Sequence, residues 1–175
     1  MEIRILDQTE QESIYADAYA MLAAADHEFV PPLSARNSST QQDLTGSAAN
    51  GSVALYFENL KSQRFAAAFE DGELIAFVSY RENYFCPQIS PEDAPNIYLS
   101  TLVASPAARG KGITKALYSK LFSEYENSYV FTRTWSTNIA HIKILRFFGF
   151  ETLTVLENDR GNGIDTIYFK KAIQN

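Results

Sequence analysis

The stretch that decides the fold is residues 97–117, which read IYLSTLVASPAARGKGITKAL. Residues 97–104 are almost all apolar or β-branched, which is typical of a central strand that is covered on both faces. A serine and a proline end that strand, and from Ile113 onward apolar residues recur at the spacing of a helix. The sequence therefore predicts a strand, a short glycine-bearing loop and a helix in direct succession.

The loop Arg109-Gly110-Lys111-Gly112 has the properties of an anion-binding site. Its two glycines lack a Cβ, so the backbone can approach an anion closely. The first turn of the following helix has amide donors without an intrahelical partner and carries the positive end of the helix dipole. Residues 105–120 contain four basic side chains and no acid, although the chain as a whole has a formal charge of −6. These features favour a phosphate ligand, and a solvated glycine turn is the alternative for the loop taken alone.

At this point the sequence resembles the GNAT superfamily of acyl-CoA-dependent N-acetyltransferases. The pyrophosphate motif of that family, (Q/R)-x-x-G-x-(G/A), corresponds here to Arg109–Thr114, with threonine in place of the final small residue. Asn138 and the pair Gly149-Phe150 are similar to the residues that open and close the next helix of the family. The resemblance is specific over residues 97–151.

The resemblance implies a fold of the mixed α/β (α+β) class, formed by residues 1–175 as one domain. It implies a mostly antiparallel sheet of about seven strands, helices on both faces, and a splay between the fourth and fifth strands. It also implies acetyl-CoA as the cofactor and direct transfer of the acetyl group to a primary amine. The residues expected to hold the cofactor are Leu102, Val103, Arg109, Gly110, Lys111, Gly112, Ile113, Thr114, Asn138 and His141.

The groups that move protons are harder to assign from the sequence. Many family members have a tyrosine at the position of Leu145, where it protonates the CoA thiolate, and leucine cannot supply a proton. His141 lies four residues earlier, so it shares a helix face with Leu145 and is a candidate relay with a near-neutral pKa. Glu82, at the end of an earlier strand, is a candidate base. A solvated charge for Glu82 and a packing role for His141 are the alternatives.

The rest of the chain is consistent with this element order. We expect a strand near Ile3, a helix over residues 8–28, a long loop over residues 31–52, and then a short helix. A β-hairpin should turn at Asp71-Gly72. The elements expected after the motif are strands over residues 129–135, 150–157 and 164–170 and a helix over residues 138–148.

Composition narrows the class of protein. Apolar residues make up 46% of the 175, enough for a substantial core, and the charge of −6 disfavours nucleic acid and anionic membranes as partners. The single cysteine excludes an intrachain disulfide and a thiolate metal site, so no metal is expected. We found no signal peptide or membrane-spanning run and expect a cytoplasmic protein.

The acceptor is expected to be a small-molecule or peptide amine that enters beside residues 26–60 and 81–96. The acidic net charge mildly suits a cationic amine. A homodimer is possible. Two alternatives to an active enzyme stay open: a CoA-binding regulatory or sensor domain with weak or no catalysis, and a partner-binding α/β domain without a nucleotide.

Overall fold

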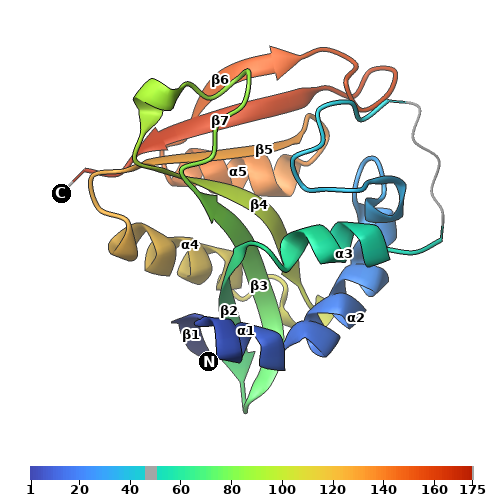
Figure 1. The fold of residues 1–175 in the computed structure, drawn as a ribbon, viewed down its shortest axis with the longest axis vertical. Helices are drawn as coiled ribbons and strands as arrows, with labels where there is room; N and C mark the ends of the chain where they lie inside the picture. Colours follow the sequence, from blue (N-terminus) through green and yellow to red (C-terminus); the bar gives the residue numbers. More distant parts are fainter. Residues whose placement is uncertain (46–50, 175) are drawn as a thin grey trace.

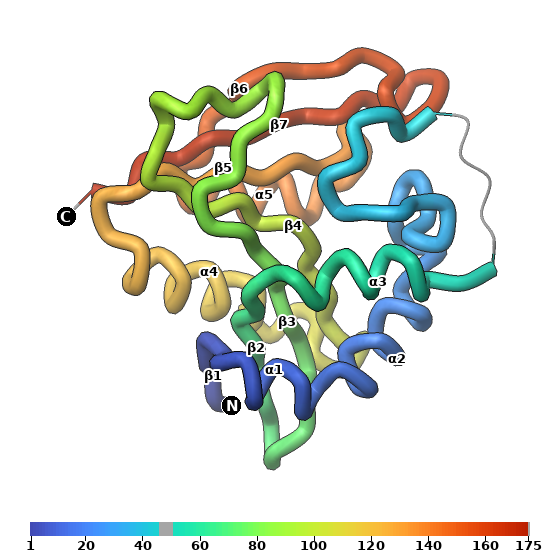
Figure 2. The backbone as a smooth tube through the Cα atoms, in the orientation of Figure 1, coloured from blue at the N-terminus to red at the C-terminus, as the bar shows by residue number. Residues whose placement is uncertain are grey.

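The computed structural model describes residues 1–45 and 51–174, and its arrangement is shown in Figures 1 and 2. Part of the long loop predicted over residues 31–52, and the last residue of the predicted domain, lie outside this range. Seven strands form one sheet in the order β1-β2-β3-β4-β5-β7-β6. The strands are β1 (Glu2–Ile5), β2 (Arg64–Glu70), β3 (Glu73–Glu82), β4 (Asn96–Ala104), β5 (Tyr129–Trp135), β6 (Glu151–Leu156) and β7 (Thr166–Ala172).

Helices cover both faces of the sheet (Figure 1). The helices are α1 (Gln8–Ser13), α2 (Tyr15–Ala25), α3 (Ala54–Leu60), α4 (Ile113–Glu124) and α5 (Ile139–Phe147). Apolar side chains of α2 and α3 pack with Phe65 and Phe77 in one core cluster. Side chains of α4 and α5 pack with Val130 and Phe169 in another cluster on the opposite face. The mixed fold with a mostly antiparallel sheet, predicted from the sequence, is confirmed.

The predicted helix over residues 8–28 is broken in the structure. The helical geometry stops at Ile14, which caps α1 and precedes α2. The break allows α1 to contact β2 while α2 runs across β3 and β4. A short 3-10 turn, Asp26–Glu28, then ends the segment. Residues 8–28 have a helical composition throughout, so the sequence gives no sign of the break at Ile14. The break goes with the packing of the two helices against different strands.

The sheet splays open between β4 and β5, as predicted. These strands form the one parallel pair of the sheet, and their pairing runs only from Asn96 with Tyr129 to Leu99 with Thr132. At the last pair the Thr132 hydroxyl donates to the carbonyl of Leu99 over 3.0 Å. Beyond it β4 continues to Ala104, bonded to β3 alone. The part of β4 that follows Leu99 therefore offers its other edge to an opening in the sheet.

Candidate active site

A cleft of about 340 Å³ occupies the opening between β4 and β5. Its walls come from both faces of the sheet, so it connects the side of α4 and α5 with the side of α2 and α3. On the first side the lining residues include Thr114, Tyr118, Asn138, His141 and Ile144. On the second side they include Phe29, Arg36, Tyr56, Arg133, Trp135 and Arg160.

The loop Arg109–Gly112 and the first turn of α4, which we together call the cradle, have the backbone geometry of an anion-binding site, as the sequence predicts. Gly110 and Gly112 have φ angles of +75° and +76°, a region that residues with a Cβ rarely adopt. A Cβ at either position would meet no atom within 4 Å among the described residues, so the space above the loop is open. Gly112 caps α4 without a side-chain hydrogen bond, which leaves the first amides of the helix free. This arrangement fits the diphosphate of CoA.

The basic side chains of this segment, by contrast, already have partners. Arg109 donates to Glu28 over 2.9 Å and to the carbonyl of Ala104. Lys111 lies 4.0 Å from a carboxylate oxygen of Glu70. The other two cations are also engaged, Lys115 over the ring of Phe147 and Lys120 with Glu124. The absence of acids in residues 105–120 therefore does not mean that the charges lack partners, because two of the four cations meet acids from distant segments and the other two meet a ring and an acid one helical turn later.

The strand end next to the cradle carries further features of a binding site. Leu102 and Val103 line the cleft, where the sequence places the CoA arm. Ser100 is the extra residue at a β-bulge, since Leu99 pairs with Tyr80 and Thr101 pairs with Ser79. Its hydroxyl is buried and has no hydrogen-bond partner among the residues that the structure describes. The bulge was not predicted from the sequence, because an isolated serine in an apolar strand gives no signal for it.

Asn138 has a structural role that accounts for its position. Its side-chain oxygen accepts from the amide of His141 at the start of α5, over 3.4 Å. Its amide nitrogen donates to the hydroxyl of Thr134 over 3.0 Å. Asn138 thus fixes the beginning of α5 to the end of β5 while facing the cleft.

His141 and Tyr118 meet at the wall of the cleft. The Tyr118 hydroxyl and His141 Nε2 are hydrogen-bonded over 2.8 Å. Burial lowers the pKa of His141 to about 4, so the imidazole is neutral at pH 7. Burial also raises the pKa of Tyr118, so the phenol keeps its proton. Tyr118 was not among the site residues predicted from the sequence, although its spacing of four residues from Thr114, which places both on one helix face, was a usable signal.

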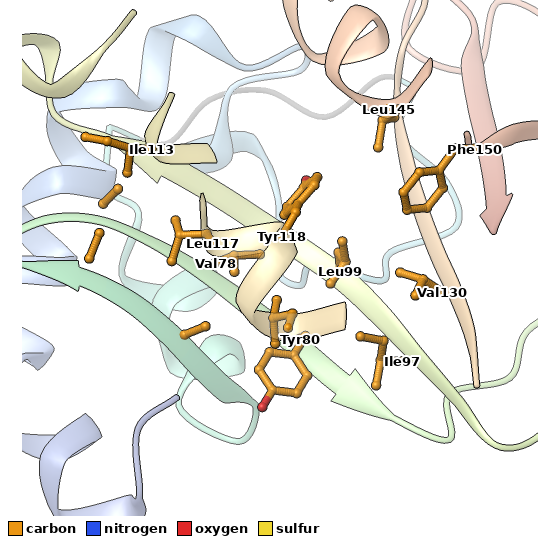
Figure 3. Close-up of a cluster of buried hydrophobic side chains, with 14 of the residues drawn as sticks. Val78, Tyr80, Ile97, Leu99, Ile113, Leu117, Tyr118, Val130, Leu145 and Phe150 are labelled. Carbon is orange, nitrogen blue, oxygen red and sulfur yellow. The ribbon is translucent and has the colours of Figure 1, made fainter. Parts of the chain in front are cut away.

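Leu145 lies in the core instead of facing the cleft. Its side chain is fully buried, and Figure 3 shows it close to Phe150. It is not among the residues that line the cleft, although His141 and Ile144 are. The sequence predicts that Leu145 and His141 share one helix face toward the CoA arm, but of the two only His141 lines the cleft. Two residues one helical turn apart on α5 therefore have different surroundings: His141 lines the cleft and Leu145 packs in the core.

Glu82 does not reach the cleft. Its carboxylate bonds to Arg64 over 2.8 Å and accepts from the hydroxyl of Tyr125. These residues line a separate hollow at the other end of β3, beside Lys120 and Glu124. The structure therefore separates Glu82 from the other predicted site residues, and the solvated, paired charge is the interpretation that it supports.

Sequence reasoning also missed the residues on the far side of the cleft. Arg36, Arg133 and Arg160 all line it and are buried. Tyr56 and Thr101 are hydrogen-bonded there over 2.6 Å. The five residues come from separate parts of the chain, so no local pattern joins them.

Comparison with known proteins agrees with this geometry. The sequence profile of the acetyltransferase (GNAT) family matches residues 23–150. The chain belongs to this acetyltransferase family. The match includes the cradle and Asn138 but begins only within α2 and ends before β6 and β7. No protein with a curated description matches the sequence significantly.

Solved structures of GNAT acetyltransferases share the whole fold. An N-acetyltransferase from Staphylococcus aureus Mu50 is 17% identical, with a TM-score of 0.66 over 98% of this chain and 97% of that one. A ribosomal-protein-alanine N-acetyltransferase from Brucella melitensis is 16% identical, with a TM-score of 0.64 over 99% and 100% of the two chains. A Salmonella typhimurium protein solved with its cofactor acetyl-CoA is 15% identical, with a TM-score of 0.65 over 100% and 95%. At such identities the likeness shows the fold.

Membership of the family confirms the resemblance that the motif predicted, and acetyl-CoA is the cofactor of this family. Three parts of this GNAT chain fit acetyl-CoA: the cradle, the edge of β4 that is not paired with β5, and the cleft. Among the described residues, no helix has the length and apolar character needed to cross a membrane.

Proposed function

We propose that the protein transfers the acetyl group of acetyl-CoA to a primary amine bound in the cleft between β4 and β5. The observation that carries this proposal is that one cleft joins the two faces of the sheet at the splay. A cofactor held at the α4 side and an acceptor entering from the α2 side would then meet beside Ser100 and Thr101. Acetyl-CoA supplies an acetyl group that is activated as a thioester.

The residues of the cradle would hold the cofactor by its diphosphate. The amides of Lys111, Gly112, Ile113 and Thr114 supply the donors, and Gly110 gives the loop its left-handed turn. The strand end at Leu102 and Val103 would bind the pantetheine arm and polarise the carbonyl oxygen, because its edge has no strand partner toward β5. Arg109 would keep its contact with Glu28 and brace the loop against the 3-10 turn that follows α2.

The transfer needs a neutral amine and a proton for the departing sulfur. The amine nitrogen forms the new bond to carbon as the C–S bond breaks, and the electron pair of that bond goes to sulfur. We assign the proton that sulfur takes up to the Tyr118 hydroxyl, with His141 behind it as the neutral relay. Water restores that proton as the amine releases its own to solvent. Tyr118 and His141 would thus take over the role of the tyrosine that many family members have at the position of Leu145.

A regulatory or sensor domain that binds CoA without turnover is the alternative, and Leu145 is the residue that favours it. The test is the melting temperature with acetyl-CoA, with ATP and NAD as controls, followed by thiol release with a panel of amines. A ligand at 100 times its Kd adds about 2.7 kcal/mol of stability. Stabilisation by acetyl-CoA together with amine-dependent thiol release supports the enzyme. Stabilisation without turnover on any amine supports the sensor, and no stabilisation overturns both.

A further inference from the structure

Three arginine side chains gather on the α2 side of the cleft. Arg36 follows a 3-10 turn, Arg133 belongs to β5, and Arg160 lies in the loop between β6 and β7. Their exposed fractions are 7%, 8% and 6%, and all three line the cleft. Hydrogen bonds tie two of them to the segment around Arg36: Arg160 donates to the carbonyl of Val30 over 2.7 Å and Arg133 donates to that of Gln41 over 2.6 Å.

None of the three guanidinium groups forms an ion pair with a carboxylate within residues 1–45 and 51–174. Arg36 donates twice to one backbone carbonyl, over 3.1 and 2.7 Å. Arg133 and Arg160 donate to carbonyls and hydroxyls. Neutral acceptors orient a guanidinium but leave its charge in place. The acceptors are Pro31, Ser39, Gln41, Tyr168, Val30 and Thr166.

Two nearby acids, Asp26 and Asp159, act on the charges of Arg36 and Arg160, but among the described residues neither comes within ion-pair distance of a guanidinium group. Asp26 accepts from the amide and the hydroxyl of Ser34, over 2.7 Å each. Asp159 accepts from the hydroxyl of Thr166. Among the described lining residues Glu28 is the one acid, and it pairs with Arg109. Three guanidinium charges therefore stand near two carboxylates that do not touch them, so this side of the cleft carries a surplus of positive charge in a chain whose net charge is −6.

This surplus costs stability when no anion is present. Burial, and then the positive charges of Arg36 and Arg133, lower the pKa of Arg160 to about 9. Burial also lowers the pKa of Arg36. At Arg133 burial acts in the same direction, but the phenols of Tyr98 and Tyr168 outweigh it and raise the pKa. An unpaired buried charge is strongly unfavourable, and a protein retains one where a ligand or partner supplies the opposite charge.

Some guanidinium donors remain available for such a ligand. Within the described residues, Arg36 Nη1 and Arg160 Nη2 donate to no acceptor. Guanidinium groups match the geometry of carboxylate and phosphate oxygens, and hydrogen bonds between such charged groups are about twice as strong as neutral ones. Two donors on separate side chains that face one cleft are suited to an oxyanion.

We propose that Arg36, Arg133 and Arg160 bind an oxyanion of the acceptor, so that the acceptor is a small amine carrying a carboxylate or a phosphate group. This inference rests on the proposed transfer reaction and names its acceptor class. This acceptor class is the opposite of the cationic amine that the net charge alone favours. The same positive charges favour the neutral form of a bound amine, which suits a cleft in which no described acid is free to act as a base.

The first experiment measures anion binding without acetyl-CoA. The probes are glutarate, inorganic phosphate, the uncharged glutaramide and pentane-1,5-diamine, at constant ionic strength, followed by melting temperature and titration calorimetry. We expect saturable binding of glutarate or phosphate, at least tenfold tighter than that of glutaramide, and no binding of the diamine. The comparison of glutarate with phosphate decides between the two oxyanions. Equal responses to glutarate and glutaramide overturn the proposal.

Variants locate the binding site. Arg160→Gln should weaken anion binding at least tenfold, and Arg160→Lys, which keeps the charge without the planar fork, should weaken it less. Arg146→Gln is the matched control, because Arg146 also donates to a carbonyl and a hydroxyl but lies outside the cleft. Equal losses in Arg160→Gln and Arg146→Gln contradict the assignment. If the Arg160 variants do not fold, the probe series on the unmodified protein decides.

A last comparison separates this inference from the proposed function. Acetyl transfer is measured to L-glutamate, L-glutamine and L-glutamine amide, which keep the same α-amine and lose carboxylates stepwise. Rates per unit concentration should fall at least tenfold across the series. Equal rates overturn the anionic acceptor and leave the transferase in place. Anion binding without stabilisation by acetyl-CoA overturns the transferase and leaves the anion site in place.

Discussion

The hydroxyl of Tyr118 and the Nε2 atom of His141 lie 2.8 Å apart at the wall of the cleft, although 23 residues separate them in the chain. Tyr118 comes from α4 and His141 from α5, the two helices that cover the same face of the sheet. A protonated phenol therefore stands beside a neutral imidazole at the side of the cleft that carries the cradle. In the mechanism that we propose, this pair, and not Leu145, supplies the proton that sulfur takes up.

Tyr118→Phe removes the hydroxyl and keeps the ring in the core. General acids contribute about 10²- to 10⁴-fold to a rate, so we expect kcat to fall at least tenfold with the Kd for acetyl-CoA unchanged. Steady-state thiol release and calorimetry measure the two quantities. Tyr125→Phe is the control, because the Tyr125 hydroxyl bonds to Glu82 and Tyr80 away from the cleft. An unchanged kcat in Tyr118→Phe would remove the proposed donor.

His141 should make the stability of the protein depend on pH. Its pKa is lowered by burial to about 4 in the fold, against about 6.5 in the unfolded chain. The unfolded state binds more protons between these values, so the free energy of unfolding falls as pH drops from 6.5 toward 4. The slope is at most about 1.4 kcal/mol per pH unit. Urea unfolding at pH 7, 5.5 and 4.5 measures it.

The variant His141→Asn should flatten this dependence in the same urea experiment. His27, the other histidine, is unchanged and gives the background common to both proteins. Parallel stability curves for the two proteins over pH 4.5–7 would show that the His141 imidazole does not titrate with a lowered pKa.

Gly112→Glu should abolish the cradle. Its carboxylate would stand in the open space above the loop and repel the diphosphate, so we expect the Kd for acetyl-CoA to rise at least 100-fold. Gly72→Glu is matched to it, since Gly72 in the β2–β3 turn also has a positive φ and no atom within 4 Å of a built Cβ. Both variants carry the same backbone strain and added charge. Equal affinities in the two would show that the phosphates bind elsewhere.

Leu145→Tyr restores the residue type of many family members but should not restore its function. Leu145 is 0% exposed, so a larger side chain overpacks the core and costs about 1–3 kcal/mol of stability. Ile139→Tyr, on the same helix at a position that is 55% exposed, should change stability by less than about 0.5 kcal/mol. Thermal unfolding and thiol release measure both. A rise in kcat for Leu145→Tyr would mean that this position faces the cofactor after all.

Local patterns in the sequence determined much of the fold and one part of the site. The strand, glycine loop and helix of residues 97–117 lie within one short segment, so their hydrogen bonds and backbone conformations are set by neighbours in the chain. Asn138 and Gly149 mark the ends of α5 for the same reason, as an N-cap and a left-handed residue that follows the helix.

Tertiary structure alone decided which charges are paired. Arg109 meets Glu28 from 81 positions away, and Lys111 meets Glu70, so two of the four cations of the basic segment meet acids that are remote in the chain. Arg36, Arg133 and Arg160 have the opposite outcome, because folding buries them in one cleft among carbonyls and hydroxyls. Net charge and local charge patterns carry no information on such long-range pairing.

The tertiary structure also determined in which direction each candidate side chain points. His141 and Leu145 share a helix face by spacing, yet one lines the cleft and the other fills the core. Glu82 stands at the end of β3, where the sequence suggested a base, but its side chain lines a separate hollow and pairs with Arg64. The sequence by itself determined where a loop with the backbone geometry of an anion cradle forms, because that geometry belongs to consecutive residues. Only the fold decided which side chains face it and which acceptor the opposite wall can hold, because those depend on how distant segments pack.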